Sequence, residues 1–141
     1  MTETALLEES DAPEICLSAL KALGVRLILD DFGTGFSSLG YLRRFPLDGI
    51  KLDRSFVEDL AEPSADSAIV RAVVEMAGAL GLDVVAEGVE NAEQLEAVTK
   101  LGCHHAQGFH FSPPVPAAEV PALLQGQPWA TVRLAPDEIG T

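Results

Sequence analysis

Hydrophobic and polar positions follow two different periods along this chain, and the two alternate. Short, nearly continuous apolar runs are typical of buried strands, whereas apolar residues spaced three and four apart are typical of helices with one buried face. The short runs predict strands at residues 25–29, within 48–53, at 83–86 and at 103–106. The longer spacing predicts helices at residues 12–23, 37–44, 64–80, 91–101 and 116–124.

The order of these elements indicates the fold class. Asn91 and Gln94 have the spacing of a capping box at a helix start, and Gly24, Gly81 and Gly102 follow three of the helices. Because helices and strands alternate with short connections, we predict an α/β fold with a parallel sheet and right-handed crossovers. An eight-unit barrel needs ~250 residues. The 141 residues therefore suit an open sheet or part of a barrel.

Polar side chains stand at the ends of the four predicted strands. They are Asp30, Lys51, Glu87 and Gln107. The carboxyl ends of parallel strands meet at one edge of a sheet, which is where α/β barrels carry their chemistry. We therefore expect the four side chains to converge on a common mouth.

Two carboxylates are adjacent at Asp30 and Asp31. The pattern predicts that they end the first strand and that a loop begins at Phe32. Adjacent carboxylates in a buried place repel each other unless a cation or hydrogen bonds offset their charge, and hard divalent cations prefer such oxygen ligands. The alternative is a solvated turn, because Asp and Gly are ordinary turn residues.

The other strand-end residues also allow two interpretations each. Lys51 can pair with a phosphate, orient a water or offset carboxylates, or it can form an ordinary surface salt bridge. Glu87 can ligate a metal while Glu90 braces the loop, or both can be carboxylates at a helix N-terminus. Gln107 follows an apolar run and is expected to be buried, with structural or ligand partners.

The overall charge narrows the range of partners. With 22 acidic residues against 9 basic ones the net charge is −13, which would repel a nucleic-acid polymer or an anionic membrane. A small phosphate ligand is compatible if a bound cation reverses the local field. No apolar stretch approaches the ~20 residues of a membrane span, and residues 1–10 lack the features of a signal peptide. We therefore expect a cytoplasmic protein, in which Cys16 and Cys103 are reduced and buried.

Four sequence strings together resemble the ordered motifs of one family. They are LDDFGTGFSS at residues 29–38, IKLD at 50–53, AEGVE at 86–90 and AQG at 106–108. In order and spacing they are similar to the motifs of the EAL-domain family of bacterial cyclic di-GMP phosphodiesterases. The resemblance extends over nearly the whole chain, from about residue 2 to residue 124.

The resemblance implies a fold and a reaction. The fold is a partial TIM-like (β/α) barrel, about the C-terminal half of an EAL barrel, in residues 1–124, followed by a tail at residues 125–141. The reaction is the hydrolysis of cyclic di-GMP to linear pGpG with Mg²⁺ or Mn²⁺, and the complete family domain holds two ions. Cations on clustered carboxylates would neutralise the phosphate and lower the pKa of the attacking water.

The resemblance also implies roles for individual residues. The residues that match metal ligands are Asp30, Asp31 and Glu87. Lys51 and Glu87 match the catalytic residues, with Lys51 holding the attacking water or a phosphate oxygen. Gln107 and Asp53 match residues that contact the substrate. The residues expected to support the adjoining loop are Glu3, Phe32, Gly33, Thr34, Gly35 and Glu90.

The chain departs from the family pattern in its ligand set. The signature Glu-Ala-Leu segment, an asparagine ligand and a further glutamate ligand are not in this sequence. We therefore expect weak or no turnover from this polypeptide alone. The alternative function is a catalytically inactive EAL-like module for binding or dimerisation in cyclic di-GMP signalling. An open half-barrel exposes both edges of its sheet, so we expect a homo-oligomer or a completing partner chain.

Overall fold

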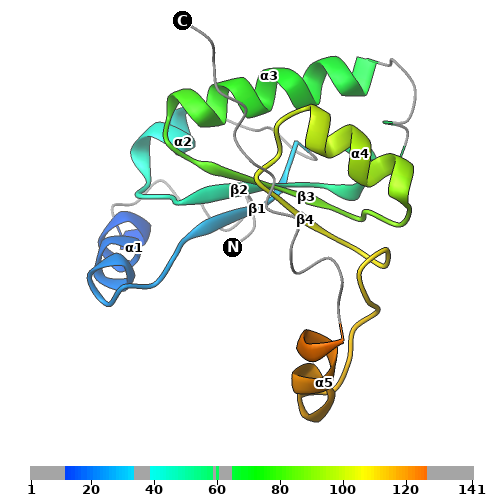
Figure 1. Ribbon diagram of the computed structural model, residues 1–141. Coiled ribbons are helices and arrows are strands. Elements are labelled where there is room, and N and C mark those ends of the chain that lie inside the picture. The colour runs from blue at the N-terminus through cyan, green and yellow to red at the C-terminus, as the bar shows by residue number, and fades with distance from the viewer. Residues whose placement is uncertain (1–11, 34–38, 59, 61–64, 127–141) are drawn as a thin grey trace, which may run out of the picture.

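The computed structural model describes residues 12–33, 39–58, 60 and 65–126, and its centre is a four-stranded parallel sheet (Figure 1). The strands are β1 (Ile28–Phe32), β2 (Gly49–Leu52), β3 (Asp83–Glu87) and β4 (His105–Gln107). They lie side by side in the order β1-β2-β3-β4, and every neighbouring pair is parallel. The predicted α/β class with a parallel sheet is therefore confirmed.

Some of the helices cover one face of this sheet. The helices are α1 (Ala12–Ala22), α2 (Leu39–Arg44), η2 (Arg54–Phe56), α3 (Ala65–Ala79), α4 (Ala92–Lys100), η3 (Ala117–Glu119) and α5 (Val120–Gln125). Figure 1 shows α2, α3 and α4 on the same side of the sheet, with α5 on the other side beyond β4. A short 3-10 helix and α5 thus replace the single helix predicted at residues 116–124.

The hydrophobic core lies between the sheet and the helices that cover this face. Ile50 pairs with Val84 and Leu52 pairs with Ala86 across β2 and β3, and all four side chains are buried. Because side chains alternate between the faces of a strand, the residues between them point to the opposite face. Lys51 is one of those residues, and Glu87, which follows Ala86, has the same orientation. The sheet therefore presents both on the face that α2, α3 and α4 leave uncovered.

Strand β1 extends further than its sequence pattern predicted. The prediction placed the strand at residues 25–29 with the two aspartates at its end, but the structure begins it at Ile28 and continues it through both aspartates to Phe32. Leu29 pairs with Ile50 and Phe32 pairs with Leu52, so three steps along β1 match two steps along β2. This is a β-bulge, which accommodates one extra residue. Phe32 is 5% exposed, and its burial in the core holds the strand end beyond the aspartates.

The helix start predicted at Asn91 is confirmed. The Asn91 side chain accepts a hydrogen bond from the backbone N–H of Gln94 at 2.9 Å, as an N-cap does. The Gln94 side chain accepts in turn from the backbone N–H of Glu90 at 2.8 Å, one residue before the position expected for a full capping box. The loop after β3 is thereby tied to the first turn of α4.

Three other predictions concern the cysteines, a membrane span and the domain boundary. Both cysteines are free, but only Cys103 is buried, and the expectation of a buried Cys16 was wrong because α1 turns that side toward solvent. None of the described helices combines the length and apolar character needed to cross a membrane. Residues 127–141 lie outside the described part, so the domain boundary at residue 124 stays a prediction.

Candidate metal centre

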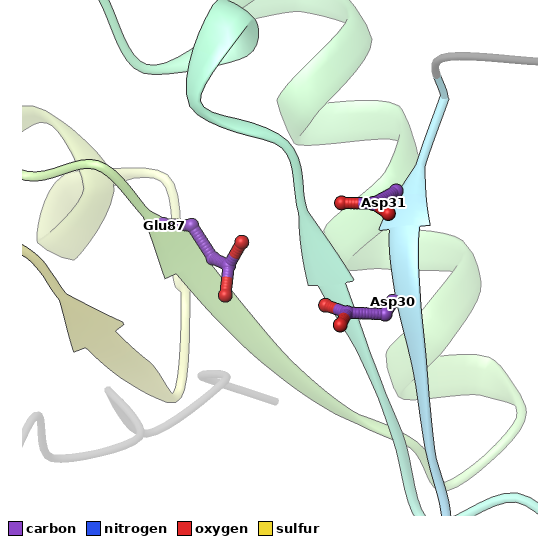
Figure 2. A group of neighbouring side chains, drawn as sticks. All are labelled: Asp30, Asp31 and Glu87. Carbon is purple, nitrogen blue, oxygen red and sulfur yellow. The ribbon is translucent and has the colours of Figure 1, made fainter. Parts of the chain in front are cut away.

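Three carboxylates meet at the carboxyl end of the sheet. Asp30 and Asp31 come from β1 and Glu87 is the last residue of β3, and one oxygen from each lies within 4.8 Å of the others. Figure 2 shows the aspartates and Glu87 pointing toward one another from strands that flank β2. All three residues are half-buried. The predicted convergence is confirmed for Asp30 and Glu87, and Asp31 joins them.

The bulge in β1 is what brings the two aspartates together. In a regular strand, adjacent side chains point to opposite faces, which would send Asp31 into the helix-covered core. Asp31 instead has a left-handed backbone with φ of 56°, a conformation that Asp tolerates better than most residues. The extra residue lets Phe32 return to the core while Asp31 joins Asp30.

Lys51 supplies the positive charge at this cluster. It lies on β2, between the strands that carry the carboxylates, and its Nζ atom is 2.9 Å from Oδ1 of Asp30 and in direct contact with Oε1 of Glu87. Desolvation alone would lower the pKa of Lys51, but its direct contact with Glu87 and its ion pair with Asp30 raise the pKa above its ordinary value. The side chain therefore stays an ammonium at neutral pH and offsets the repulsion between the carboxylates.

One buried oxygen of the cluster has an ion pair in place of a hydrogen bond with the described residues. Oδ1 of Asp30 is buried and has no well-aligned hydrogen bond with the described residues, although the Lys51 ammonium is near enough for an ion pair. Buried polar atoms normally have such a bond. An oxygen of this kind, beside two further carboxylates, fits a hard divalent cation. Asp30, Asp31 and Glu87 are the residues that would hold it.

Gln107 reaches the same edge of the sheet but differs from its prediction. It pairs with Glu87 in the β3–β4 register, so the two residues are neighbours at the strand ends. Its side chain is exposed, and the expectation of a buried glutamine was wrong. The Gln107 side chain is exposed because β4 lies at the edge of the described sheet. Its backbone oxygen accepts from the N–H of Val89 at 3.1 Å, which is the main-chain role of this position.

Asp53 and Glu90 lie just beyond the strand ends. The carboxylate of Asp53 accepts a hydrogen bond from the backbone N–H of Ser55 at 3.0 Å and caps η2. Hydrogen bonds from the Ser55 side chain and backbone lower the pKa of Asp53. Glu90 is exposed, and its backbone N–H binds Gln94. Contact of Asp53 with a substrate stays a prediction.

The helix η2 supports the edge of the site, and the hydrophobic pattern of the sequence did not predict it. Gly33 has φ of 99°, and a Cβ atom there would lie 2.5 Å from the ring of Phe56. Gly88 has φ of 73°, and a Cβ atom there would lie 2.5 Å from Cβ of Arg54. The ends of β1 and β3 thus both pack on η2. The signal for this turn is Asp53 two residues before Ser55, a common side-chain cap.

Three residues expected to support the neighbouring loop lie outside the described part of the chain. They are Glu3, Thr34 and Gly35. Phe32 is described and is buried at the end of β1, next to Gly33. The support expected from Phe32 and Gly33 is consistent with these contacts, and their role toward a ligand stays a prediction.

Comparison with known proteins identifies the family. The family model described as "EAL domain" matches residues 1–114. This chain belongs to the EAL domain family. The sequence resemblance therefore led to the correct family, and its four motifs begin on β1, β2, β3 and β4, near the strand ends that form the candidate centre.

One relative and two solved structures illustrate the match. Over 124 residues the chain is 46% identical to the bifunctional diguanylate cyclase/cyclic di-GMP phosphodiesterase MucR of Pseudomonas aeruginosa, covering 88% of this chain and 18% of MucR. The crystal structure of the EAL domain of Mycobacterium smegmatis DcpA is 41% identical, with a TM-score of 0.82, covering 89% of this chain and 57% of that one. The manganese/cy-diGMP complex of Klebsiella pneumoniae BlrP1 is 42% identical, with a TM-score of 0.74, covering 80% of this chain and 29% of that one.

The extent of these matches places the chain within the family fold. It spans 14–18% of the length of the curated relatives that it matches. It also corresponds to a part of the DcpA EAL domain, with the same arrangement of strands and helices. The fold predicted as a partial TIM-like barrel is therefore confirmed.

Proposed function

We propose that this EAL segment serves the metal-dependent hydrolysis of cyclic di-GMP to linear pGpG. The observation that carries the proposal is the meeting of Asp30, Asp31 and Glu87 around the Lys51 ammonium at the carboxyl edge of the sheet. The similarity to BlrP1, whose structure is described as a manganese/cy-diGMP complex, supports both the metal and the ligand. MucR, a named cyclic di-GMP phosphodiesterase, supports the reaction.

Some residues of the site would bind a cation, and others would contact the phosphate or the rest of the substrate. Asp30, Asp31 and Glu87 would hold Mg²⁺ or Mn²⁺, two ions being expected in the complete domain. Such an ion, when bound, neutralises phosphate charge and lowers the pKa of a water molecule. Lys51 stays positively charged and is placed to orient a phosphate oxygen or the attacking water. Gln107, beside Glu87 in the register, and Asp53 are proposed to contact the substrate from the same edge.

The direct test is a hydrolysis assay on the 141-residue chain. Because several family ligands are not in this sequence, we expect pGpG to form slowly at most. Its formation should require Mg²⁺ or Mn²⁺ and should be lost in Asp30→Asn, because the amide cannot replace an ionised ligand. Asp66→Asn, in the first turn of α3, is the matched control and should keep the rate. If the wild type forms no pGpG, or if Asp30→Asn is as active as the control, the proposal is wrong. Binding of cyclic di-GMP with Ca²⁺ but no turnover would instead support the inactive binding module.

We also propose that the chain associates, either with a second copy or with a completing partner chain. In the described sheet β1 and β4 are the edges, and exposed edges invite pairing with another chain. Phe109 and Leu124, near β4, are 66% and 71% exposed. Sedimentation of the chain at micromolar concentration should show a dimer or larger species. A monomer at all concentrations, with no added partner, would contradict self-association.

A cytoplasmic location belongs to the same proposal. It is supported by the two free thiols, Cys16 and Cys103, because free cysteines persist in reducing compartments. Fractionation of expressing cells should recover the chain with cytoplasmic markers. Recovery from an oxidising compartment with modified Cys16 would argue against it.

A further inference from the structure

The position of Lys51 in the sheet puts its ammonium where a metal would bind. Lys51 pairs with Val85 across β2 and β3, and Glu87 follows Val85 by two residues on the same face. Asp30 lies on the other neighbour of β2. The lysine side chain therefore rises between two of the three carboxylates, and this arrangement is dictated by the register of the strands.

The ammonium and a bound cation would compete for the same carboxylates. Nζ of Lys51 contacts Oε1 of Glu87 and lies 2.9 Å from Oδ1 of Asp30, which are carboxylates that would ligate a metal. Oδ1 of Asp30 is also the buried oxygen without a well-aligned hydrogen bond. Two positive charges on shared ligands repel each other strongly at such distances. Either the Lys51 ammonium or the cation therefore has to move away from the carboxylates of Asp30 and Glu87.

We propose that Lys51 is a built-in competitor for the metal site, in addition to any role toward the phosphate. Its ammonium holds Asp30 and Glu87 together when no metal is bound, and it withdraws from them when a divalent cation binds. A flexible four-carbon stem permits this movement, and the side chain is 23% exposed, so solvent can receive the displaced ammonium. The inference rests on the metal site of the proposed function.

The test measures metal binding and stability rather than turnover. Mn²⁺ is titrated calorimetrically into the wild-type chain, Lys51→Met and the control Lys100→Met, whose lysine pairs with Glu96 on α4. Removing a unit charge a few ångströms from the ligand oxygens should tighten Mn²⁺ binding by Lys51→Met on the order of tenfold. Lys100→Met should bind Mn²⁺ as the wild type does.

A second readout follows the metal-free protein. In EDTA, Lys51→Met should melt a few degrees below the wild type, because Asp30 and Glu87 lose their ion pairs with Lys51 and stay clustered with Asp31. Added Mn²⁺ should then raise its melting temperature more than it raises that of the wild type. Circular dichroism checks that the variant folds, and Lys51→Gln repeats both measurements if it does not.

The outcomes separate this inference from the proposed function. Equal or weaker Mn²⁺ binding by Lys51→Met, or an unchanged melting temperature in EDTA, would overturn the competitor role. If the wild type still hydrolyses cyclic di-GMP in that case, the proposed function stands alone. A wild type that binds no Mn²⁺ would overturn both.

Discussion

The carboxylates of Asp30 and Asp31 meet on the same side of β1, although the two residues are adjacent in the strand. The left-handed backbone of Asp31, with φ of 56°, makes this possible within the bulge opposite β2. A metal centre built from consecutive residues thus depends on one backbone conformation. The conformation and the ligand charge can be separated by mutation.

Substitutions at Asp31 should separate stability from metal binding. Asp31→Asn should stay within about 0.5 kcal/mol of the wild-type free energy of unfolding, since Asn also tolerates a left-handed backbone, but it should bind Mn²⁺ more weakly. Asp31→Ala should lower the free energy of unfolding by about 1–2 kcal/mol. Urea unfolding in EDTA measures the first effect and calorimetry the second. Equal stability of the Asn and Ala variants would contradict the role given to the backbone.

The close approach of Gly108 to the loop after β3 predicts a second mutational effect. A Cβ atom at Gly108 would lie 2.1 Å from the carbonyl oxygen of Val89, so Gly108→Ala must move backbone. We expect the free energy of unfolding to fall by about 1–3 kcal/mol. The matched control is Gly78→Ala, inside α3 with nothing within 4 Å of its Cβ position, which should gain about 0.5–1 kcal/mol. Chemical unfolding of both variants that shows the same sign would refute this account.

Asp48 should make stability depend on pH. Its carboxylate accepts hydrogen bonds from Lys21 at 2.5 Å and from the backbone N–H of Leu27 at 2.6 Å, and these interactions lower its pKa in the folded protein. A lowered folded-state pKa means that the stabilisation is complete above the unfolded-state pKa of about 4 and is lost as the pH falls through the folded-state pKa.

Asp48→Asn tests this dependence. At pH 7 the variant should lose about 1–3 kcal/mol of unfolding free energy, because the charged hydrogen bonds at Asp48 are weakened. Below about pH 4 the difference from the wild type should shrink. Urea unfolding across this range measures both, with Asp66→Asn as the control. A difference that grows toward low pH would show that the assigned sign is wrong.

The two cysteines should differ in reactivity. Cys16 is exposed on α1, whereas Cys103 is 1% exposed, and burial raises the pKa of the Cys103 thiol to about 12. Because the thiolate is the reactive form, Ellman's reagent at pH 8 should modify Cys16 quickly and Cys103 only after unfolding. Cys16→Ser should remove the fast phase. Rapid reaction of two thiols in the native chain would contradict the burial of Cys103.

Much of the fold and part of the site could be predicted from the sequence. The alternation of the two apolar periods predicted the parallel sheet, and the Asn91 cap was read from its own local spacing. The convergence of Asp30, Lys51 and Glu87 followed because the carboxyl ends of parallel strands share one edge. These features depend on short-range preferences and on general rules of topology, which a single sequence contains.

Other features were decided only by the tertiary structure. Strict alternation would have separated Asp30 from Asp31, but the burial of Phe32 opposite Leu52 required an extra residue in β1 and so joined them. The exposure of Gln107 depends on β4 being the edge of the described sheet. The contacts of Lys51 with both carboxylates depend on strand register. Register and edge position arise from contacts between segments far apart in the chain, which local patterns do not specify.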